Sequence, residues 1–317
     1  MKTFSKIALI SAMLAISAGV SAQTQLKVAT GGPTGTYHRM FTEFQQACKD
    51  QIMQIEVPSK GSVDNMDKLL GNEVNAAIVQ TDVLFFRARN EDLGGIKTLF
   101  ALYPEEVHVI TPAVSPILEG GTLGMGKKPA VFNTVNDLNG RAVAAWGGSI
   151  VTAQVIRLQS EITFTVTEVA DFKAAKAALD AGQVAAIVMV GGQPMDDVKA
   201  LNNAYKLLSF PEATMGKLKS VYVPAKLNYS GMGQGGSGVQ SIATESLYVP
   251  RSYKTPKYVE SLAALRGCFK SSVAELQETT GMHKKWSAVN PDNTGKWSYY
   301  ELPTVVAAPA QTVTKKK

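Results

Sequence analysis

The chain has 317 residues and a formal net charge of +6, from 32 Lys and Arg residues against 26 Asp and Glu residues. Five of the basic residues stand near the two ends, at Lys2, Lys6 and 315–317, so the body of the chain is close to neutral, which argues against a nucleic-acid surface. A chain of this length is too long for one ordinary core and favours two domains.

The first 22 residues are expected to be a cleavable signal peptide. Lys2 and Lys6 give a positive start, an apolar run follows at 7–20, and the small residues at 20–22 fit a signal-peptidase site. The apolar run is shorter than the roughly 20 residues that span a bilayer, and no charged flank follows it. The mature protein is therefore expected to be exported and to begin near Gln23. No second run is apolar enough to cross a membrane.

From Leu26 onward, short runs with strand propensity alternate with helical patterns, which is typical of an α/β protein with largely parallel sheets. The first part of the chain is expected to contain strands at 26–30, 52–57 and 76–79, and helices at 38–50, from Ser62 onward and around 85–87. Ser62 and Asn65 form a variant of the capping pattern. Thr81 and Asp82 are expected to cap the third helix.

A strand at 107–111 is expected to leave the first lobe, followed by a crossover in the Gly- and Pro-rich stretch 112–129. The alternation then restarts, with strands at 141–145, 164–167 and 184–190 and helices at 149–158 and 171–181. The glycine-rich segment 231–238 is expected to be flexible, and a strand at 241–249 to return to the first lobe. We therefore predict lobe 1 at 23–111 and 241–303, lobe 2 at 112–240, and a disordered tail at 304–317.

The two cysteines, Cys48 and Cys268, are available for a disulfide in an oxidising compartment. Each also lies on the apolar face of a predicted amphipathic helix, Cys48 with Phe41 and Phe44, and Cys268 beside Phe269. Spacing alone leaves both alternatives open: a disulfide, or small buried apolar side chains. The CxxC pattern of redox and zinc sites is absent from the sequence.

Three turns rich in glycine or hydroxyl side chains stand between a predicted strand and a predicted helix, at 31–37, 60–63 and 146–149. Backbone N–H groups at such turns coincide with the positive end of a helix dipole, which makes them a site for a carboxylate or a phosphate. A single turn of this kind is more often ordinary helix capping. Two in the first lobe and one in the second, all at the carboxyl ends of strands, favour a ligand site between the lobes.

Nucleotide-binding and catalytic motifs do not fit the sequence. The first turn lacks the Lys-Ser/Thr of a phosphate-binding loop, and the serine-hydrolase pattern that starts at Gly147 fails at Val151. His38, His108 and His283 stand far apart, without metal-binding spacing. His108, within an apolar strand, is expected to be a core residue, and His38 is the only histidine expected near the cleft. We therefore expect no enzymatic activity, no cofactor and no metal.

Several blocks of this sequence resemble the TAXI-type solute receptors, the extracytoplasmic binding subunits of one branch of TRAP transporters. The blocks are ATGGPTGTY at 29–37, GSVDNM at 61–66 with AAIVQTDV at 76–83, LYPEEVH at 102–108, DLNGRAV at 137–143 and ALDAGQVAA at 178–186. They cover most of the mature chain in order, and the first three together are specific.

The resemblance implies a type II periplasmic binding fold, in which two α/β lobes surround a ligand cleft and two crossing strands form the hinge. It also implies a periplasmic location, a small anionic ligand such as an amino acid or a dicarboxylate, and a TRAP-type membrane permease as the partner through which the protein meets the inner membrane. By position, the residues implied to line the cleft are Thr36, Tyr37, Ser62, Val63 and Gln80 from lobe 1, and Gly148 and Ser149 from lobe 2.

The chain departs from the family pattern at two places near this predicted site. The second-lobe turn usually reads Gly-Ser-Gly-Thr, but here Ser149 is followed by Ile and Val and the turn is preceded by Trp146. Lys60 stands where the family often has glycine and would add a positive charge. We therefore expect a ligand other than plain glutamate. The departures also motivate a second hypothesis, a periplasmic ligand sensor or scaffold partner of a membrane signalling protein. A third, a secreted hydrolase, would need Ser149 paired with a histidine.

Overall fold

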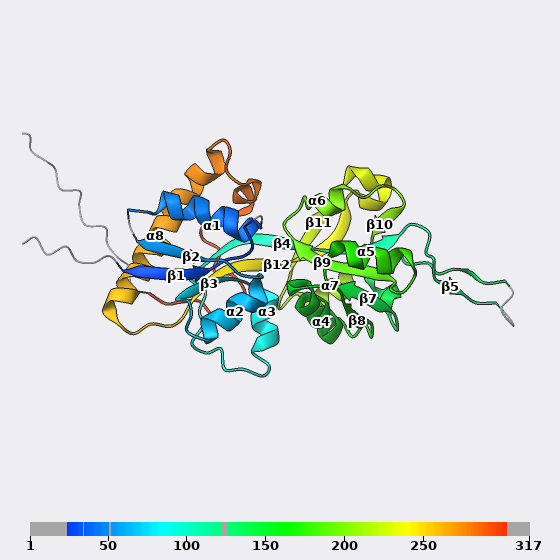
Figure 1. The fold of residues 1–317 in the computed structure, drawn as a ribbon, viewed down its shortest axis with the longest axis horizontal. Helices are drawn as coiled ribbons and strands as arrows, with labels where there is room; N and C mark the ends of the chain where they lie inside the picture. Colours follow the sequence, from blue (N-terminus) through cyan, green and yellow to red (C-terminus); the bar gives the residue numbers. More distant parts are fainter. Residues whose placement is uncertain (1–23, 34, 51, 122–125, 303–317) are drawn as a thin grey trace, which may run out of the picture.

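The computed structural model describes residues 24–33, 35–50, 52–121 and 126–302. These residues form two α/β lobes, and two long strands, β4 (Phe100–Pro112) and β12 (Val239–Pro250), pass from one lobe to the other (Figure 1). This arrangement is that of a type II periplasmic binding fold, so the predicted fold class is confirmed. The signal peptide predicted at 1–22 and the tail predicted at 304–317 lie outside the described residues.

Lobe 1 combines the early part of the chain with its last described part. Its strands run parallel in the order β2 (Met53–Val57), β1 (Gln25–Ala29) and β3 (Ala76–Gln80), and β12 pairs antiparallel with β3. The helices that cover this sheet are α1 (Thr36–Ala47), α2 (Ser62–Leu70), α3 (Thr81–Arg87), α8 (Pro256–Glu278) and the 3-10 helix η3 (Lys284–Ala288). All five residues of β3 are buried, as expected of a strand covered on both faces.

Lobe 2 repeats this logic with the middle of the chain. Strands β9 (Ala186–Gly191), β7 (Ala142–Ala145) and β8 (Thr165–Glu168) run parallel, β4 pairs antiparallel with β9, and β10 (Tyr205–Leu207) and β11 (Val223–Leu227) pair with β4 and β12. Its helices are α4 (Gly148–Ser160), α5 (Phe172–Asp180), α6 (Asp196–Lys199), α7 (Glu212–Leu218) and the 3-10 helices η1 (Val135–Leu138) and η2 (Ser230–Gly236). In both lobes, loops that follow the carboxyl ends of parallel strands lie towards the other lobe.

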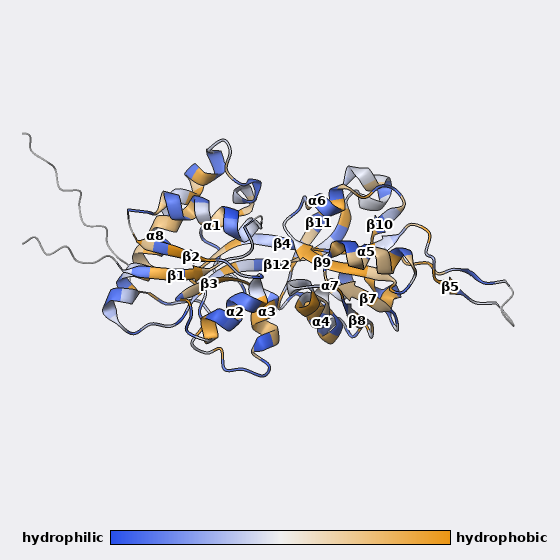
Figure 2. Ribbon diagram, in the orientation of Figure 1, coloured by the Kyte–Doolittle hydropathy of each residue, from blue (hydrophilic) through white to orange (hydrophobic). Residues whose placement is uncertain are grey.

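Hydropathy follows this architecture. Figure 2 shows apolar residues along β9, whereas β4 and β12 are pale or blue where they pass between the lobes. The passage between the lobes is therefore polar, although Glu105, Glu106 and Glu245 on these strands are all buried. Buried polar groups need partners, and these three acids find theirs in Tyr37, Lys285 and Asn293.

Helix α1 is held to lobe 1 by its apolar face. Met40, Phe41 and Phe44 follow the spacing of three and four that places side chains on one side of a helix, and all three are buried. The ring of Phe44 meets Phe100 of β4 and Phe269 of α8 edge-on, and Phe100 and Phe269 stack with their centroids 3.9 Å apart. This packing fixes the position and direction of the N-terminus of α1.

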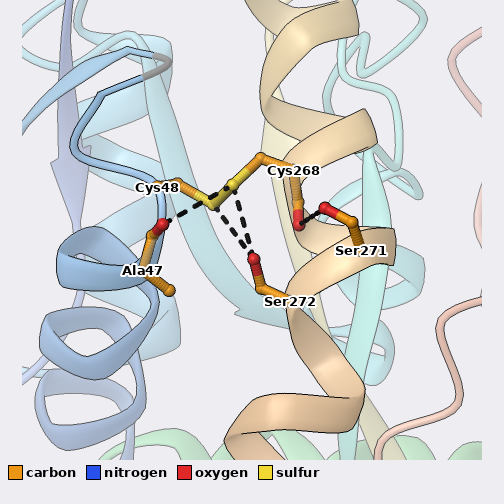
Figure 3. The surroundings of a disulfide bond; sticks show 5 residues. All are labelled: Ala47, Cys48, Cys268, Ser271 and Ser272. Carbon is orange, nitrogen blue, oxygen red and sulfur yellow. Dashed lines mark hydrogen bonds between the residues drawn. A yellow bond between two sulfur atoms is a disulfide. The ribbon is translucent and has the colours of Figure 1, made fainter.

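The structure pairs Cys48 with Cys268, the two cysteines whose state the sequence left open. Their Cα atoms lie 6.0 Å apart, and the bond connects the end of α1 to α8 (Figure 3). The hydroxyl of Ser272 lies 3.6 Å from the sulfur of Cys268. The disulfide therefore closes a loop that spans 220 positions of sequence and ties the two ends of lobe 1 together.

The chain passes from lobe 1 to lobe 2 inside β4, not in the stretch 112–129 where the sequence predicted a crossover. The first half of β4 pairs with β12, and residues 106–110 pair with β9 of lobe 2. One continuous strand makes the passage because its backbone hydrogen bonds move directly from one partner strand to the next. The stretch 112–129 instead enters a short hairpin, β5 (Leu118–Glu119) with β6 (Lys128–Pro129), which projects from lobe 2 (Figure 1).

The glycine-rich segment 231–238 is not the flexible loop that its composition predicted. Most of it forms η2, which packs on lobe 2. A Cβ atom at Gly231 would lie 2.6 Å from the carbonyl oxygen of Leu201, and one at Gly235 would lie 2.8 Å from Cβ of Lys206. These glycines therefore allow close backbone packing rather than motion.

The helix caps predicted at Ser62, Thr81 and Asp82 are wrong. The N-cap residues of α2 and α3 are Gly61 and Gln80, and neither makes a side-chain capping bond. Ser62 and Asp82 instead lie inside their helices, where both side chains are buried and bonded to other elements. Asn65 is also buried, and its amide donates to two backbone carbonyl oxygens of the sheet. The side chains that the local sequence pattern predicted as caps therefore make hydrogen bonds to other elements of the fold instead.

None of the helices in the described part of the chain combines the length and the apolar character that a membrane span requires.

Candidate functional site

A cavity of about 940 Å³ lies between the two lobes. Lobe 1 lines it with the β1–α1 loop, the turn before α2, Tyr103 and Glu105 of β4, and residues 282–285 at η3. Lobe 2 lines it with residues 190–197 and 199, from the end of β9 into α6. A ligand in this cavity would contact both lobes, which is what a ligand needs in order to favour one lobe arrangement over another.

Helix α1 begins at the wall of this cavity. Its N-cap residue is Gly35, which has no side chain that could cap the helix, and its first turn contains no acidic residue. Gly35, Thr36 and Tyr37 all line the cavity. Free backbone N–H groups and the positive end of the helix dipole together attract an anion. Helix α2 is a weaker anion site, because Asp64 stands in its first turn and accepts the backbone N–H of Lys60.

A buried carboxyl group, Glu105, stands in the wall beside this helix end. Its Oε1 accepts the Tyr37 hydroxyl at 2.5 Å, and its Oε2 accepts the Gln80 amide at 3.0 Å. Burial raises the pKa of Glu105 to about 7, although these hydrogen bonds favour the charged form. Ser62 completes the network, because its hydroxyl lies 3.1 Å from the Tyr37 hydroxyl and accepts the backbone N–H of Gln80. Glu105 is thus held by the side chains of Tyr37 and Gln80, and Ser62 supports both of these residues.

The next residue, Glu106, is a carboxylate with a counter-ion inside the protein. The Nζ of Lys285 lies 2.8 and 2.9 Å from its two oxygens and also donates to the carbonyl oxygen of Pro104. The backbone N–H of Gln193, in lobe 2, donates to the same carboxylate at 2.7 Å. A Cβ at Gly192 would lie 2.5 Å from Cε of Lys285, so the lysine stem passes directly over this glycine. The pair therefore joins η3, β4 and lobe 2 at one edge of the cavity.

Basic side chains outnumber acidic ones around the cavity. The basic residues are Arg39, Lys60, Lys199, Lys284 and Lys285, and the acidic ones are Glu105, Asp196 and Asp197. Lys285 is neutralised by Glu106, and Arg39 donates to Glu43 and to the carbonyl oxygen of Gly281. Lys60 and Lys284 are exposed and make no ion pair within the described part of the chain. Lys199 is paired with Asp196, at 3.4 Å, so among the described residues Lys60 and Lys284 face Glu105 and Asp197 as the wall charges without an ion pair. Attraction for an anion therefore comes from the end of α1 and not from a net charge of the walls.

The second-lobe turn at 146–149 does not line the cavity. Trp146 packs edge-on against Phe172 of α5, with ring centroids 6.1 Å apart. The Ser149 hydroxyl accepts the backbone N–H of Val190 at 3.1 Å. Gly148 lies against lobe 1, since a Cβ there would be 2.9 Å from Oε1 of Gln80. The turn is thus occupied by contacts within lobe 2 and between the lobes.

The lobes meet closely beside this turn, where α3 packs on α4 (Figure 1). Asp82 of α3 is fully buried, and its Oδ2 accepts the hydroxyls of Thr152 at 2.7 Å and Tyr222 at 3.0 Å, both in lobe 2. Its Oδ1 lies 3.3 Å from the hydroxyl of Thr244 on β12. Burial raises the pKa of Asp82, and these hydroxyl groups oppose that rise. This cluster connects the lobes on the side of β4 and β12 that α3 and α4 cover.

The nine predicted ligand-binding residues are therefore divided among several environments. Three line the cavity: Thr36, Tyr37 and Lys60. Ser62 and Gln80 lie behind the wall and support it through Tyr37 and Glu105, and Val63 packs against the hydrophobic core. Trp146, Gly148 and Ser149 belong to the interlobe and lobe 2 contacts described above. Their roles as ligand contacts remain predictions.

Of the three histidines, His283 lines the cavity, whereas His38 and His108 do not. His38 lies outside the cavity walls, with its Nδ1 2.8 Å from a carboxylate oxygen of Glu56. His108 is a buried core residue whose Nε2 contacts the Tyr229 hydroxyl at 2.7 Å, and burial lowers its pKa to about 3. His283, which the sequence gave no role, lines the cavity. No hydrogen bond joins Ser149 to a histidine among the described residues, nor does any metal-binding cluster occur there.

Sequence reasoning missed Glu105, Lys285 and His283 as residues of the cavity wall. Glu105 lies in the block at 102–108 that carries the family resemblance, and two adjacent acids within an otherwise apolar strand were a signal that buried charges need partners there. Lys285 and His283 come from a polar segment after α8 that has no local pattern, so only the folded chain reveals them.

The chain is similar to one family of proteins and to several solved structures. A model of the NMT1-like family matches residues 28–263. No curated protein sequence matches the chain. Among solved structures, a TctC solute binding protein from Polaromonas gives a TM-score of 0.49 at 14% identity, covering 87% of this chain and 91% of that one. The substrate binding protein of an amino acid ABC transporter gives a TM-score of 0.47 at 12% identity, covering 80% of this chain and 94% of that one. The GluR0 ligand-binding core from Nostoc punctiforme, in complex with L-glutamate, gives a TM-score of 0.41 at 17% identity, covering 78% of this chain and 94% of that one.

Proposed function

The chain belongs to the NMT1-like family, and from this premise we propose that it is the extracytoplasmic solute-binding protein of a TAXI-type TRAP transporter. It binds a small carboxylate in the cavity between its lobes and delivers it to a membrane permease. The observation that carries the proposal is the N-terminus of α1, whose N-cap residue is a glycine, whose first turn contains no acid, and which opens into the cavity between the lobes.

The ligand carboxylate binds the backbone N–H groups of the first turn of α1, within reach of the Thr36 hydroxyl. Residues 190–193 of lobe 2 then contact the same molecule, so that binding favours the arrangement in which the lobes enclose it. Enclosure excludes water and strengthens each hydrogen bond to the anion. Charge-assisted hydrogen bonds contribute about 1.5–3 kcal/mol each, so three or four of them support roughly micromolar affinity after the cost of association.

Mass spectrometry of the small molecule released from freshly purified protein tests the proposal first. We expect a small carboxylic acid, and isothermal titration calorimetry with that acid should then give saturable binding of one molecule per chain. Release of a cation without a carboxylate, or the absence of binding by any acid in a broad panel, would contradict the proposal.

The transport role is tested separately from the binding role. Proteoliposomes that contain the permease encoded beside this protein should take up the identified acid only when the protein is added. Binding without dependence of uptake on the protein would favour the alternative, a periplasmic sensor or scaffold for a membrane signalling protein.

A further inference from the structure

We infer that the cavity selects a zwitterion: a ligand whose carboxylate binds at the N-terminus of α1 and whose ammonium group binds Glu105. The ligand is then an amino acid or a related amino-carboxylate, and not a dicarboxylate without an amine. The inference rests on the proposed function, because it adds a second charged contact to the same cavity.

The first argument is the contrast between two neighbouring buried acids. Glu106 has Lys285 as its counter-ion, with both carboxylate oxygens within 2.9 Å of the ammonium nitrogen. Glu105 is equally buried, with an exposed fraction of 6% for each residue, yet within the described ranges its hydrogen-bond donors are the neutral groups of Tyr37 and Gln80. Buried carboxylates without a counter-charge are costly. A ligand ammonium supplies the counter-charge that Glu105 lacks.

The second argument is the remaining capacity of Glu105. An ionised carboxylate accepts about four hydrogen bonds, and here each oxygen receives one. Glu105 lines the cavity, so its unused acceptor positions are reachable from the ligand side. Burial raises the pKa of Glu105 to about 7 in the unliganded protein, and an adjacent ammonium group would favour its charged form.

The third argument is the composition of the wall around Glu105. Tyr37 and Tyr103 both line the cavity beside it, with ring centroids 6.3 Å apart. Aromatic rings stabilise a neighbouring ammonium through their quadrupole, and Tyr103 already has the Lys285 ammonium 5.9 Å from its centroid. This part of the wall therefore suits a cation, whereas the end of α1 suits an anion.

Tyr37 links the two ends of this arrangement. Its backbone belongs to the first turn of α1, and its hydroxyl donates to Glu105. A zwitterion bridging the helix end and Glu105 would thus lie along a single residue of lobe 1. A dicarboxylate in the same position would place a second negative charge against Glu105.

Matched pairs of acids test the inference. Isothermal titration calorimetry at pH 8 would compare L-glutamate with glutarate, L-leucine with 4-methylpentanoate and L-phenylalanine with 3-phenylpropanoate, each pair differing by the amine. We expect at least one amino acid to bind and its partner without the amine to bind at least tenfold more weakly. Glu105→Gln should weaken the amino acid by about 10- to 100-fold, the loss of one charge-assisted contact, and leave the partner acid unchanged or tighter.

Glu245→Gln is the matched control. Glu245 is a buried acid on the other crossing strand, paired with Pro104 of β4 in register, and it does not line the cavity. It should leave the preference for the amine unchanged. In the Glu105 variant the amide of Gln80 can turn its unpartnered Oε1 towards the new amide, so the fold should tolerate the change.

Three results would overturn the inference. Equal binding of both members of every pair would reject the ammonium contact and leave carboxylate binding intact. Equal weakening of both members by Glu105→Gln would assign Glu105 a structural role. Binding of neither member of any pair, with a carboxylate that has no amine released from the purified protein, would reject the zwitterion alone, whereas the absence of any carboxylate ligand would reject the proposed function as well.

Discussion

A carboxylate placed at the start of α1 should separate ligand binding from folding. Thr36 is the first residue of α1, lines the cavity and is half-buried. Thr36→Glu puts a negative charge beside the N–H groups that we propose bind the ligand. Because α1 has no acid in its first turn, the same charge complements the helix dipole. The variant should therefore fold normally and lose its affinity for carboxylates.

The size of the loss follows from Coulomb repulsion. Two carboxylates that share one helix end lie about 4 to 6 Å apart, and with an effective dielectric constant of about 20 they repel by roughly 3 to 4 kcal/mol. That energy corresponds to a weakening of roughly two to three orders of magnitude in Kd. The new carboxylate also interacts favourably with the helix dipole, which should raise the free energy of unfolding by about 0.3–1 kcal/mol.

Calorimetric titration measures the first effect and urea unfolding the second. Lys173→Glu serves as the control, because Lys173 is exposed in the first turn of α5, which also contains no acid, and it lies outside the cavity walls. This control makes the net charge more negative than Thr36→Glu does, so a general charge effect would appear there more strongly. Unchanged affinity in a well-folded Thr36→Glu variant would refute the placement of the ligand carboxylate at α1.

Three further predictions concern stability. Replacing both Cys48 and Cys268 by Ala should lower the free energy of unfolding, because the disulfide closes a loop of 220 positions in the unfolded chain. The chain-entropy model gives a loss of up to about 5 kcal/mol. An unchanged midpoint of urea unfolding would contradict this prediction. Tyr222→Phe removes one donor to the buried Asp82 carboxylate and should cost about 1–3 kcal/mol, with unchanged stability arguing against an ionised Asp82. His108 has a folded-state pKa of about 3, below its unfolded value, so the unfolded chain binds an extra proton as pH falls below about 6.5. From pH 7 to 5 the stability of the wild type should therefore fall by about 2 kcal/mol relative to His108→Gln, and parallel pH profiles of the two would exclude this cause.

Much of the fold could be predicted from the sequence because each element carries its own pattern. The apolar spacing of Phe41 and Phe44 defines α1, and the continuous apolar run before Gln80 defines a strand buried on both faces. The repeat of this alternation after β4 predicted a second lobe. The lobe change itself was misplaced, because polar residues such as Glu105 and Glu106 gave no sign that β4 continues unbroken from one lobe to the other.

The site could be predicted only in part because its walls come from distant parts of the chain. The turn before α1, which its glycines and its position after a strand singled out, lines the cavity. Lys285 reaches Glu106 across 179 positions, which no local pattern specifies. Ser62 was expected to face a ligand, but its hydroxyl is taken by Tyr37 and by the backbone of Gln80. Local chemistry identifies candidate groups, whereas tertiary packing decides which of them remain free.

The crossing strand β4 unites recognition with lobe arrangement. Successive side chains of a strand point in opposite directions, so Glu105 faces the helix end and the cavity, and Glu106 holds Lys285 of lobe 1 and the Gln193 N–H of lobe 2. A ligand that contacts Glu105 therefore contacts the residue next to the one that already connects both lobes. Because a ligand shifts a conformational equilibrium only by its differential contacts, a small molecule at this strand favours one lobe arrangement to the extent that it also contacts residues 190–193 of lobe 2.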